Sequence, residues 1–137
     1  MDKKELIASI TPLLKSIGYK KRGMTWVKNT DLNNSIYVVV NIQSSQYDQK
    51  LYYINLGIYI RNLGKKEVPT CINDCQMQER VNCDITSETM FINIIEKWEA
   101  WYGSFESIYQ KLINDKMPML TDKRIYTYFL INNQTCK

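Results

Sequence analysis

Hydrophobic and polar residues alternate along two segments in the first half of the chain. In the segment YYINLGIYI, one side carries Tyr52, Ile54, Leu56, Ile58 and Ile60, and the other carries Tyr53, Asn55, Gly57 and Tyr59, followed by Arg61. The segment 35–43 alternates likewise, with Ile36, Val38, Val40 and Ile42 on one side and Tyr37, Val39, Asn41 and Gln43 on the other. Successive side chains of a β-strand point to opposite faces, so this pattern predicts two long strands.

The two predicted strands are joined by the polar stretch SSQYDQ, so they most simply form an antiparallel hairpin. Pairing brings their apolar sides together against the core, and their polar sides must then coincide as well. The hairpin is therefore expected to present one shared surface of amide, phenol and guanidinium groups. Solvent exposure alone does not require amide, phenol and guanidinium groups to gather on one face.

Helical spacing replaces the alternation at the start of the chain. Apolar residues three and four positions apart predict a helix over 3–17, with Gly18 as its C-terminal cap. Pro12 interrupts the pattern, so it either opens the main part of the helix or kinks it.

Helical spacing returns from residue 86 to residue 112, after TSE as an N-terminal cap, and Gly103 is a point where this stretch divides into two helices. The segment after Pro118 is ambiguous between a short helix and an edge strand. Its apolar residues at 125, 128 and 129 favour the helix.

Two shorter strands complete the predicted fold. One lies around Trp26 and Val27, and the other covers 78–85, with Val81, Cys83 and Ile85 inward and Arg80 and Asn82 on the polar side. The order of helix, strands and helices indicates an α+β fold rather than alternating βαβ units. We therefore predict an N-terminal helix, an antiparallel sheet of three or four strands and C-terminal helices.

Length and composition are those of an ordinary globular protein. The 137 residues are 45% hydrophobic and 23% charged, which fits a single α+β domain over residues 1–137. No apolar run approaches the ~18 residues that cross a bilayer, and MDKKELIASI lacks the apolar stretch of a signal peptide. We therefore expect a cytoplasmic protein with no membrane partner. Its cysteines, Cys71, Cys75, Cys83 and Cys136, should then be reduced.

The net charge of +4 is unevenly divided along the chain. Residues 1–69 hold 11 Lys and Arg against 5 Asp and Glu (+6), and residues 70–137 hold 7 against 9 (−2). The basic run KKR at 20–22 lies beside aromatic residues, which suggests nucleic-acid binding because phosphate contacts dominate such complexes. No helix-turn-helix, zinc-finger or RNA-recognition signature accompanies the run, so a solvated turn is the favoured interpretation.

The residue inventory excludes several chemistries. The chain has no histidine, so Ser-His-Asp triads, Cys-His pairs and imidazole metal ligation are absent. Neither GxGxxG nor GxxxxGK[ST] occurs, which excludes the common phosphate-binding loops. The spacing in CINDCQMQERVNC does not match that of a zinc finger. Glu96, Glu99 and Glu106 alternate with aromatic residues and are expected on the solvated side of their helix.

Three stretches of the chain resemble a known family. LLKSIGYKKRGMTWVK, VNIQSSQY and YYINLGIYI, with a cysteine followed shortly by an arginine at Cys75 and Arg80, resemble the bacterial group catalogued as domain of unknown function 4304. The similarity covers residues 5 to 85 and is most specific at 18–26, 43–45 and 55–57. The resemblance implies an α+β fold and no established activity. Some relatives resemble small proteins encoded near bacterial toxin systems, which implies an immunity or accessory role.

The shared pattern includes Gln43 and Asn55 from the polar side of the hairpin, and such groups are costly to bury without partners. They either hydrogen-bond beneath the C-terminal helices or line a groove that receives a partner. Our first hypothesis is a non-enzymatic protein-binding module. Its site would comprise Tyr37, Asn41, Gln43, Tyr53, Asn55, Tyr59, Arg61 and Arg80, because tyrosine and arginine suit interfaces.

The alternative hypothesis places a small anionic ligand, or an enzymatic pocket, on the same face. Gly57 would leave a trough there, and Arg61 and Arg80 would attract the anion. The sequence assigns no catalytic residue, no metal ligand and no cofactor, because no general base of obvious quality stands near these positions.

Overall fold

The computed structural model describes residues 2–47, 51–82, 84–118 and 120–135 of the chain. Within them, the strands are β1 (Lys20–Arg22), β2 (Thr25–Asp31), β3 (Ile36–Ser44), β4 (Tyr52–Ile60), β5 (Met77–Arg80) and β6 (Leu120–Thr121). The helices are α1 (Lys3–Ser16), α2 (Glu88–Tyr102), α3 (Phe105–Ile113) and α4 (Arg124–Thr135), with short 3₁₀ turns η1 (Arg61–Leu63) and η2 (Ile72–Asp74).

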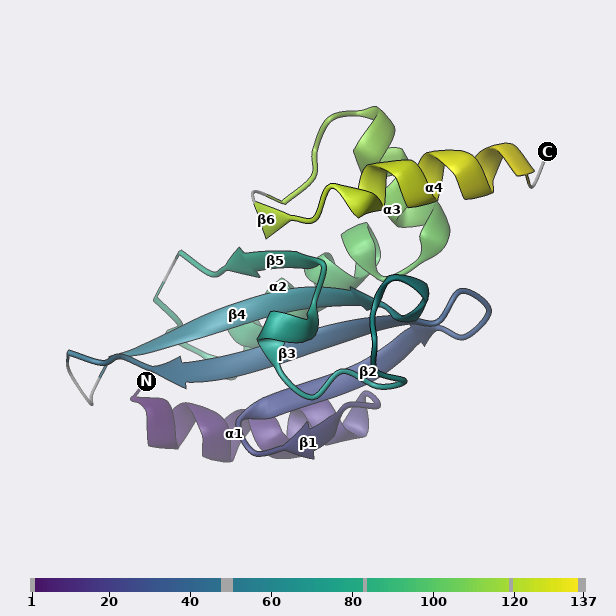
Figure 1. Cartoon of the computed structure of the whole chain (residues 1–137). Helices are drawn as coiled ribbons and strands as arrows, with labels where there is room; N and C mark the ends of the chain where they lie inside the picture. The colour runs from purple at the N-terminus through teal and green to yellow at the C-terminus, as the bar shows by residue number, and fades with distance from the viewer. Residues whose placement is uncertain (1, 48–50, 83, 119, 136–137) are drawn as a thin grey trace.

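The strands form one sheet in the order β1-β2-β3-β4-β5-β6, and every neighbouring pair is antiparallel. The chain thus moves across the sheet one strand at a time. Figure 1 shows α2 behind the sheet, whereas the connection between β4 and β5 (residues 61–76, hereafter the connection) crosses in front of it. The two faces of the sheet are therefore covered by different parts of the chain.

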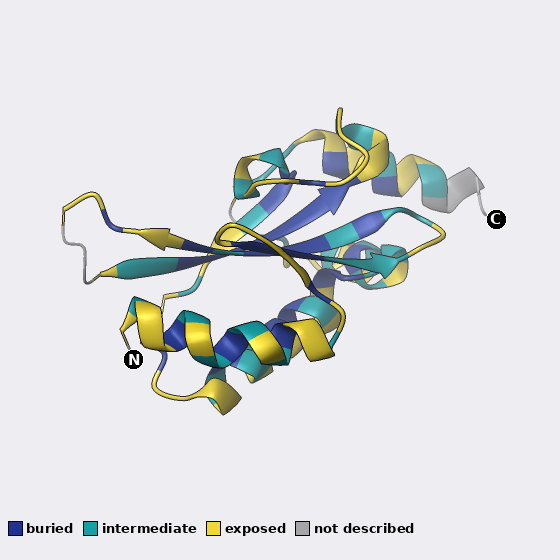
Figure 2. Ribbon diagram, turned by 90° about the horizontal axis from the view of Figure 1, so that it is seen from below, coloured by how far each residue is buried: buried dark blue, intermediate teal, exposed yellow. Residues whose placement is uncertain are grey.

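The predicted hairpin is confirmed. β3 and β4 pair along their whole length, with Asn41 opposite Asn55 and Gln43 opposite Tyr53. Their apolar sides face the helices together, so their polar sides also coincide. Figure 2 shows the outer end of this hairpin projecting beyond α1, with exposed residues along it.

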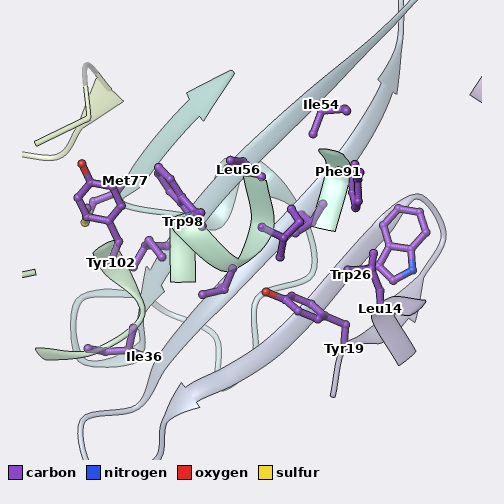
Figure 3. Packing of buried hydrophobic residues seen from close by; sticks show 14 of the residues in the cluster. Leu14, Tyr19, Trp26, Ile36, Ile54, Leu56, Met77, Phe91, Trp98 and Tyr102 are labelled. Carbon is purple, nitrogen blue, oxygen red and sulfur yellow. The ribbon is translucent and has the colours of Figure 1, made fainter. Parts of the chain in front are cut away.

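The hydrophobic core lies between the sheet and the helices. It joins apolar residues of β2, β3, β4 and β5 to buried residues of all four helices, and Figure 3 shows this packing around Trp26, Leu56, Phe91 and Trp98. The Trp98 indole also donates a hydrogen bond to the Gly57 carbonyl oxygen at 3.2 Å. This bond fixes α2 to the middle of β4.

The helices agree with the prediction. Asp2 caps α1, Pro12 lies inside it, and Gly18 follows with a φ of 102°, a conformation that glycine adopts without steric cost. Ser87 caps α2, and Gly103 separates α2 from α3. The last segment is the helix α4.

The predicted sheet of three or four strands is wrong, because the sheet has six strands within the described residues. The run KKR at 20–22, interpreted as a turn, is β1, and it pairs with β2 through a tight turn at Gly23. β6 pairs with β5 through two residues only. Neither strand has the apolar alternation that reveals a strand in a sequence.

The predicted strand over 78–85 is also longer than β5, which ends at Arg80. The backbone N–H of Val81 still donates to the Ile54 carbonyl, and Ile85 is buried in the core, so these residues do point inward. Cys83 and Cys136 lie outside the described residues.

Candidate functional site

The connection covers half of the sheet face that lies opposite the helices. A second apolar cluster forms there, in which Cys75 and Ile72 pack against Val27, Val39 and Tyr59. At Gly57, a Cβ atom would lie 2.6 Å from Cys75 Sγ and 2.8 Å from Ile72 Cδ1. The predicted trough at Gly57 is therefore wrong, because these two side chains fill it.

Polar contacts hold the connection at Lys66, in its first half, and at Gln76, its last residue. The hydroxyl of Tyr59, a residue only 1% exposed, donates to the Lys66 carbonyl and accepts from the Lys66 N–H. The Gln76 side-chain amide accepts from the Ile60 N–H at 2.7 Å and donates to the Ile60 carbonyl at 3.2 Å. Half of the predicted docking face is thus closed by the chain itself.

Asp74 organises the turn that presses on Gly57. Its carboxylate accepts from the backbone N–H groups of Thr70 (2.9 Å) and Cys71 (3.2 Å) and from Lys66 Nζ (2.9 Å). Burial acts to raise the pKa of this carboxyl, but the Thr70 N–H and the Lys66 ammonium outweigh it and hold the pKa below its usual range. A lowered pKa stabilises the fold at neutral pH, and this contribution is lost as the pH falls through the folded-state pKa.

We expect Asp74→Asn to lower the free energy of opening of the connection at pH 7 by about 1 kcal/mol, because the charge-assisted hydrogen bonds are lost. In a Cys71→Ser/Cys83→Ser/Cys136→Ser background, a thiol reagent should then label Cys75 about fivefold faster. Glu67→Gln, which changes an exposed acid of the same connection, is the control and should label at the parent rate. Equal rates for Asp74→Asn and the parent would contradict the role given to this carboxylate.

The other half of the face is polar, and its residues form a row across five strands. The strand pairing places the side chains opposite one another in the order Arg22, Thr25, Asn41, Asn55, Arg80. We call this set the polar row. It lies next to the apolar positions that the connection covers, and Gln43 and Tyr53 form the next pair outward.

Hydrogen bonds run along the polar row in one direction. Arg80 Nε donates to Asn55 Oδ1 (3.2 Å), Asn55 Nδ2 donates to Asn41 Oδ1 (3.0 Å), and Asn41 Nδ2 donates to Thr25 Oγ1 (3.1 Å). Asn55, only 7% exposed, also donates to Gln43 Oε1 at 3.1 Å. Of the two arrangements left open by the sequence, the amides are thus hydrogen-bonded, but within the sheet face and not beneath the C-terminal helices.

The guanidinium group of Arg80 is held in place yet remains accessible. Its central carbon lies 4.1 Å from the ring centroid of Tyr53, and the residue is exposed. Among the described residues, no carboxylate lies within 4.0 Å of Arg80 or of Arg22 at the other end of the row. The polar row therefore presents two positive charges that the described part of the chain does not neutralise.

The structure brings together five of the eight predicted site residues: Asn41, Gln43, Tyr53, Asn55 and Arg80. The other three lie elsewhere. Tyr59 is buried under the connection, Tyr37 is half-buried with its ring 6.2 Å from that of Tyr59, and Arg61 lies in η1, where it pairs with Glu67 at 3.3 Å.

Comparison with protein families gives a match over most of the chain. The model of the family described as domain of unknown function DUF4304 matches residues 10–129, which is most of the chain. The chain belongs to this family. The match includes the helical C-terminal part, well beyond the motifs that carried the resemblance. Comparison with curated proteins and with solved structures gave no significant match.

In this DUF4304 chain, sequence reasoning missed two members of the polar row, Thr25 and Arg22. Alternation around the recognised strand residue Trp26 could have placed Thr25 on the polar side. No sequence signal gave the register that sets Thr25 opposite Asn41. Arg22 was missed because the three charged residues of the run KKR have no apolar alternation that distinguishes a strand from a turn.

Among the remaining candidates for chemistry, Glu99 has structural partners, whereas Glu96 is exposed. Glu99, expected on the solvated side of its helix, instead accepts a hydrogen bond from the Tyr19 hydroxyl and pairs with Lys28 at 3.3 Å. Burial, together with Glu99, raises the pKa of Tyr19, and burial raises that of the Cys75 thiol.

No described helix is long and apolar enough to cross a membrane. In the described ranges, no three acidic or cysteine side chains gather as metal ligands.

Proposed function

We propose that this DUF4304 protein is a non-enzymatic binding module whose partner is an acidic protein surface that docks on the polar row. The observation that carries the proposal is the pair of arginines, Arg22 and Arg80, at the two ends of the polar row. Neither has a carboxylate partner in the described residues. Carboxylates of a partner would complete both ion pairs.

The extent of the polar row favours a protein over a small ligand. Strands of a sheet lie about 4.8 Å apart, so a row across five strands spans about 19 Å. A span of this size is that of a protein interface, which typically covers about 800 Å² on each partner. Tyr53 and Arg80 add the residue types that most often dominate interface energies.

The hydrogen bonds along the row also lower the cost of binding. Arg80 is fixed through Nε and by the Tyr53 ring, so less side-chain entropy is lost when a partner docks. Its two terminal nitrogens remain available for a bidentate contact with a carboxylate.

The family resemblance suggests one identity for this partner, namely a toxin of a bacterial toxin system. In that case the DUF4304 protein would serve as an immunity or accessory protein, and its arginines would pair with carboxylates of the toxin. A toxin gene beside this one would support the idea, and it would supply the partner to test.

Charge reversal at the row tests the proposal. We replace the exposed Gln43 by a photo-crosslinking amino acid and irradiate cells that express the protein. We expect a discrete crosslinked protein, whose purified form should bind Arg80→Glu at least about 30-fold more weakly than the parent, corresponding to ~2 kcal/mol. Arg61→Glu, which reverses an exposed arginine away from the row, should bind as the parent does.

Two results would contradict the proposal. One is the absence of any specific adduct from position 43, with adducts from a crosslinker at Lys65 as the comparison. The other is equal weakening by Arg80→Glu and Arg61→Glu, because a general loss of positive charge would then explain the binding.

A further inference from the structure

A separate hollow lies beside β1 on the same sheet face. It has a volume of about 350 Å³ and lies where the start of the sheet meets the connection. Its lining includes Lys20, Arg22, Val27, Asn29, Tyr37 and Pro69. We call it the β1 pocket. It does not contain Gly57, where the sequence placed a ligand trough.

The charged side chains that line the β1 pocket are all positive, and one of them is already paired. Lys20 and Arg22 occupy alternate positions of β1, so both face the pocket, and no described carboxylate lies within 4.0 Å of either. Lys28 also reaches the pocket, but it is paired with Glu99. The free positive charge of the pocket therefore comes from β1.

Protection of a sheet edge explains only part of this arrangement. Charged residues on an edge strand discourage pairing with other chains, and all three residues of β1 serve that purpose. Lys21, however, points to the opposite face, where its Nζ lies 5.6 Å from the Trp26 ring centroid. Lys20 and Arg22 bring their charge to the β1 pocket, which Lys21 does not line.

The other walls of the pocket suit a flat ring. Val27 is buried, the half-buried ring of Tyr37 lies beside it, and Pro69 of the connection is buried on the other side. Asn29 adds a side-chain amide whose Nδ2 can donate a hydrogen bond, while its Oδ1 already accepts from the Asp31 N–H at 3.2 Å. Ligand sites combine apolar walls with a few polar groups in this way, and volumes of about 300–1,000 Å³ are typical.

We propose that the β1 pocket binds a nucleoside monophosphate. The phosphate lies between Lys20 and Arg22, whose positions two residues apart on a strand are about 7 Å apart. A dianionic phosphate can engage both, with the arginine fork binding two of its oxygens. The base stacks against Tyr37, and Asn29 hydrogen-bonds its edge. This proposal shares Arg22 with the polar row, whereas Lys20 belongs to the β1 pocket and not to the row.

The test is calorimetric titration of the full chain at low salt with AMP, GMP, CMP and UMP. Inorganic phosphate and adenosine serve as the two halves of the ligand. We expect at least one nucleotide to bind at least tenfold more tightly than either half. Lys20→Ala should lower the affinity for that nucleotide at least tenfold. Lys21→Ala, which removes the same charge from the other face of β1, should change this affinity less than twofold.

Three results would overturn the proposal. The first is no heat from any of the four nucleotides at millimolar concentration. The second is equal weakening by Lys20→Ala and Lys21→Ala, which would indicate general attraction to a basic edge. The third is binding of inorganic phosphate as tight as that of the nucleotides. Lys20 is not part of the polar row, so none of these results bears on the proposed protein partner.

Discussion

Replacing Gln76 by leucine is expected to lower the free energy of unfolding by about 2–4 kcal/mol. The side-chain amide of Gln76, a residue only 5% exposed, accepts from the Ile60 N–H and donates to the Ile60 carbonyl. It thus takes the place of a neighbouring strand at the end of β4. Leucine has a similar size but no polar atoms, so both backbone groups of the fully buried Ile60 would lose their partners.

Urea unfolding followed by tryptophan fluorescence measures this loss, because Trp26 and Trp98 are buried. The matched control is Gln78→Leu, two residues further along the chain in β5. Gln78 is half-buried and donates one hydrogen bond, to the Cys75 carbonyl, so its replacement should cost about 1 kcal/mol or less. If the two substitutions lower the free energy of unfolding equally, the side chain of Gln76 does not replace a neighbouring strand as the hydrogen-bond partner of β4.

Gln76 also links the half of the sheet face that the connection covers to the half that carries the polar row, because its backbone positions β5. Its backbone N–H donates to the Ile58 carbonyl and its carbonyl accepts from Asp122, so it sets β5 between β4 and β6. The register of β5 then brings Arg80 opposite Asn55. Binding of the proposed partner should therefore depend on Gln76, which lies outside the proposed docking surface.

The hairpin was predictable because one side of each strand is continuously apolar. A shift of one residue would have exposed the whole set from Ile54 to Ile60, so the pattern alone determines which side faces the core. Asn41, Gln43 and Asn55 then had to share the opposite face. The helices were predictable for a similar reason, since their caps Ser87 and Gly18 stand at the ends of periodic apolar stretches.

The strand pairs at the edges were not predictable in this way. β1 consists of three exposed charged residues, and β6 has only two residues, so neither buries an apolar side that a pattern could reveal. Both are held by pairing with a longer neighbour. This is why Arg22, at one end of the polar row, was missed although Arg80, at the other end, was found.

Gly57 shows why the structure brings together only some of the predicted site residues. A glycine in a strand often marks a place where another group lies close to the backbone, but the sequence does not say whether this group is a ligand or another part of the chain. Here it is the connection, and the same packing buries Tyr59. Arg61 was placed on the face by alternation, but β4 ends at Ile60 and η1 turns the chain away.

Gly57→Ala is expected to destabilise the protein by about 1–3 kcal/mol, the usual cost of overpacking. Gly57 lies inside β4 and not at a positive φ, so alanine suits its backbone and the loss can be assigned to crowding. The added methyl group would lie 2.6 Å from Cys75 Sγ, and the connection would have to move away from the sheet.

A double-mutant cycle identifies the crowded atom. Cys75→Ala removes the Sγ atom that the new methyl group meets, so Gly57→Ala/Cys75→Ala should be more stable than the sum of the single effects by about 1 kcal/mol or more. The control cycle uses Cys71→Ala, an exposed thiol of the same connection, and should be additive. Because the connection is what separates the closed half of the face from the polar row, additivity in both cycles would mean that Cys75 does not rest on Gly57. The boundary of the proposed docking surface would then have to be drawn elsewhere.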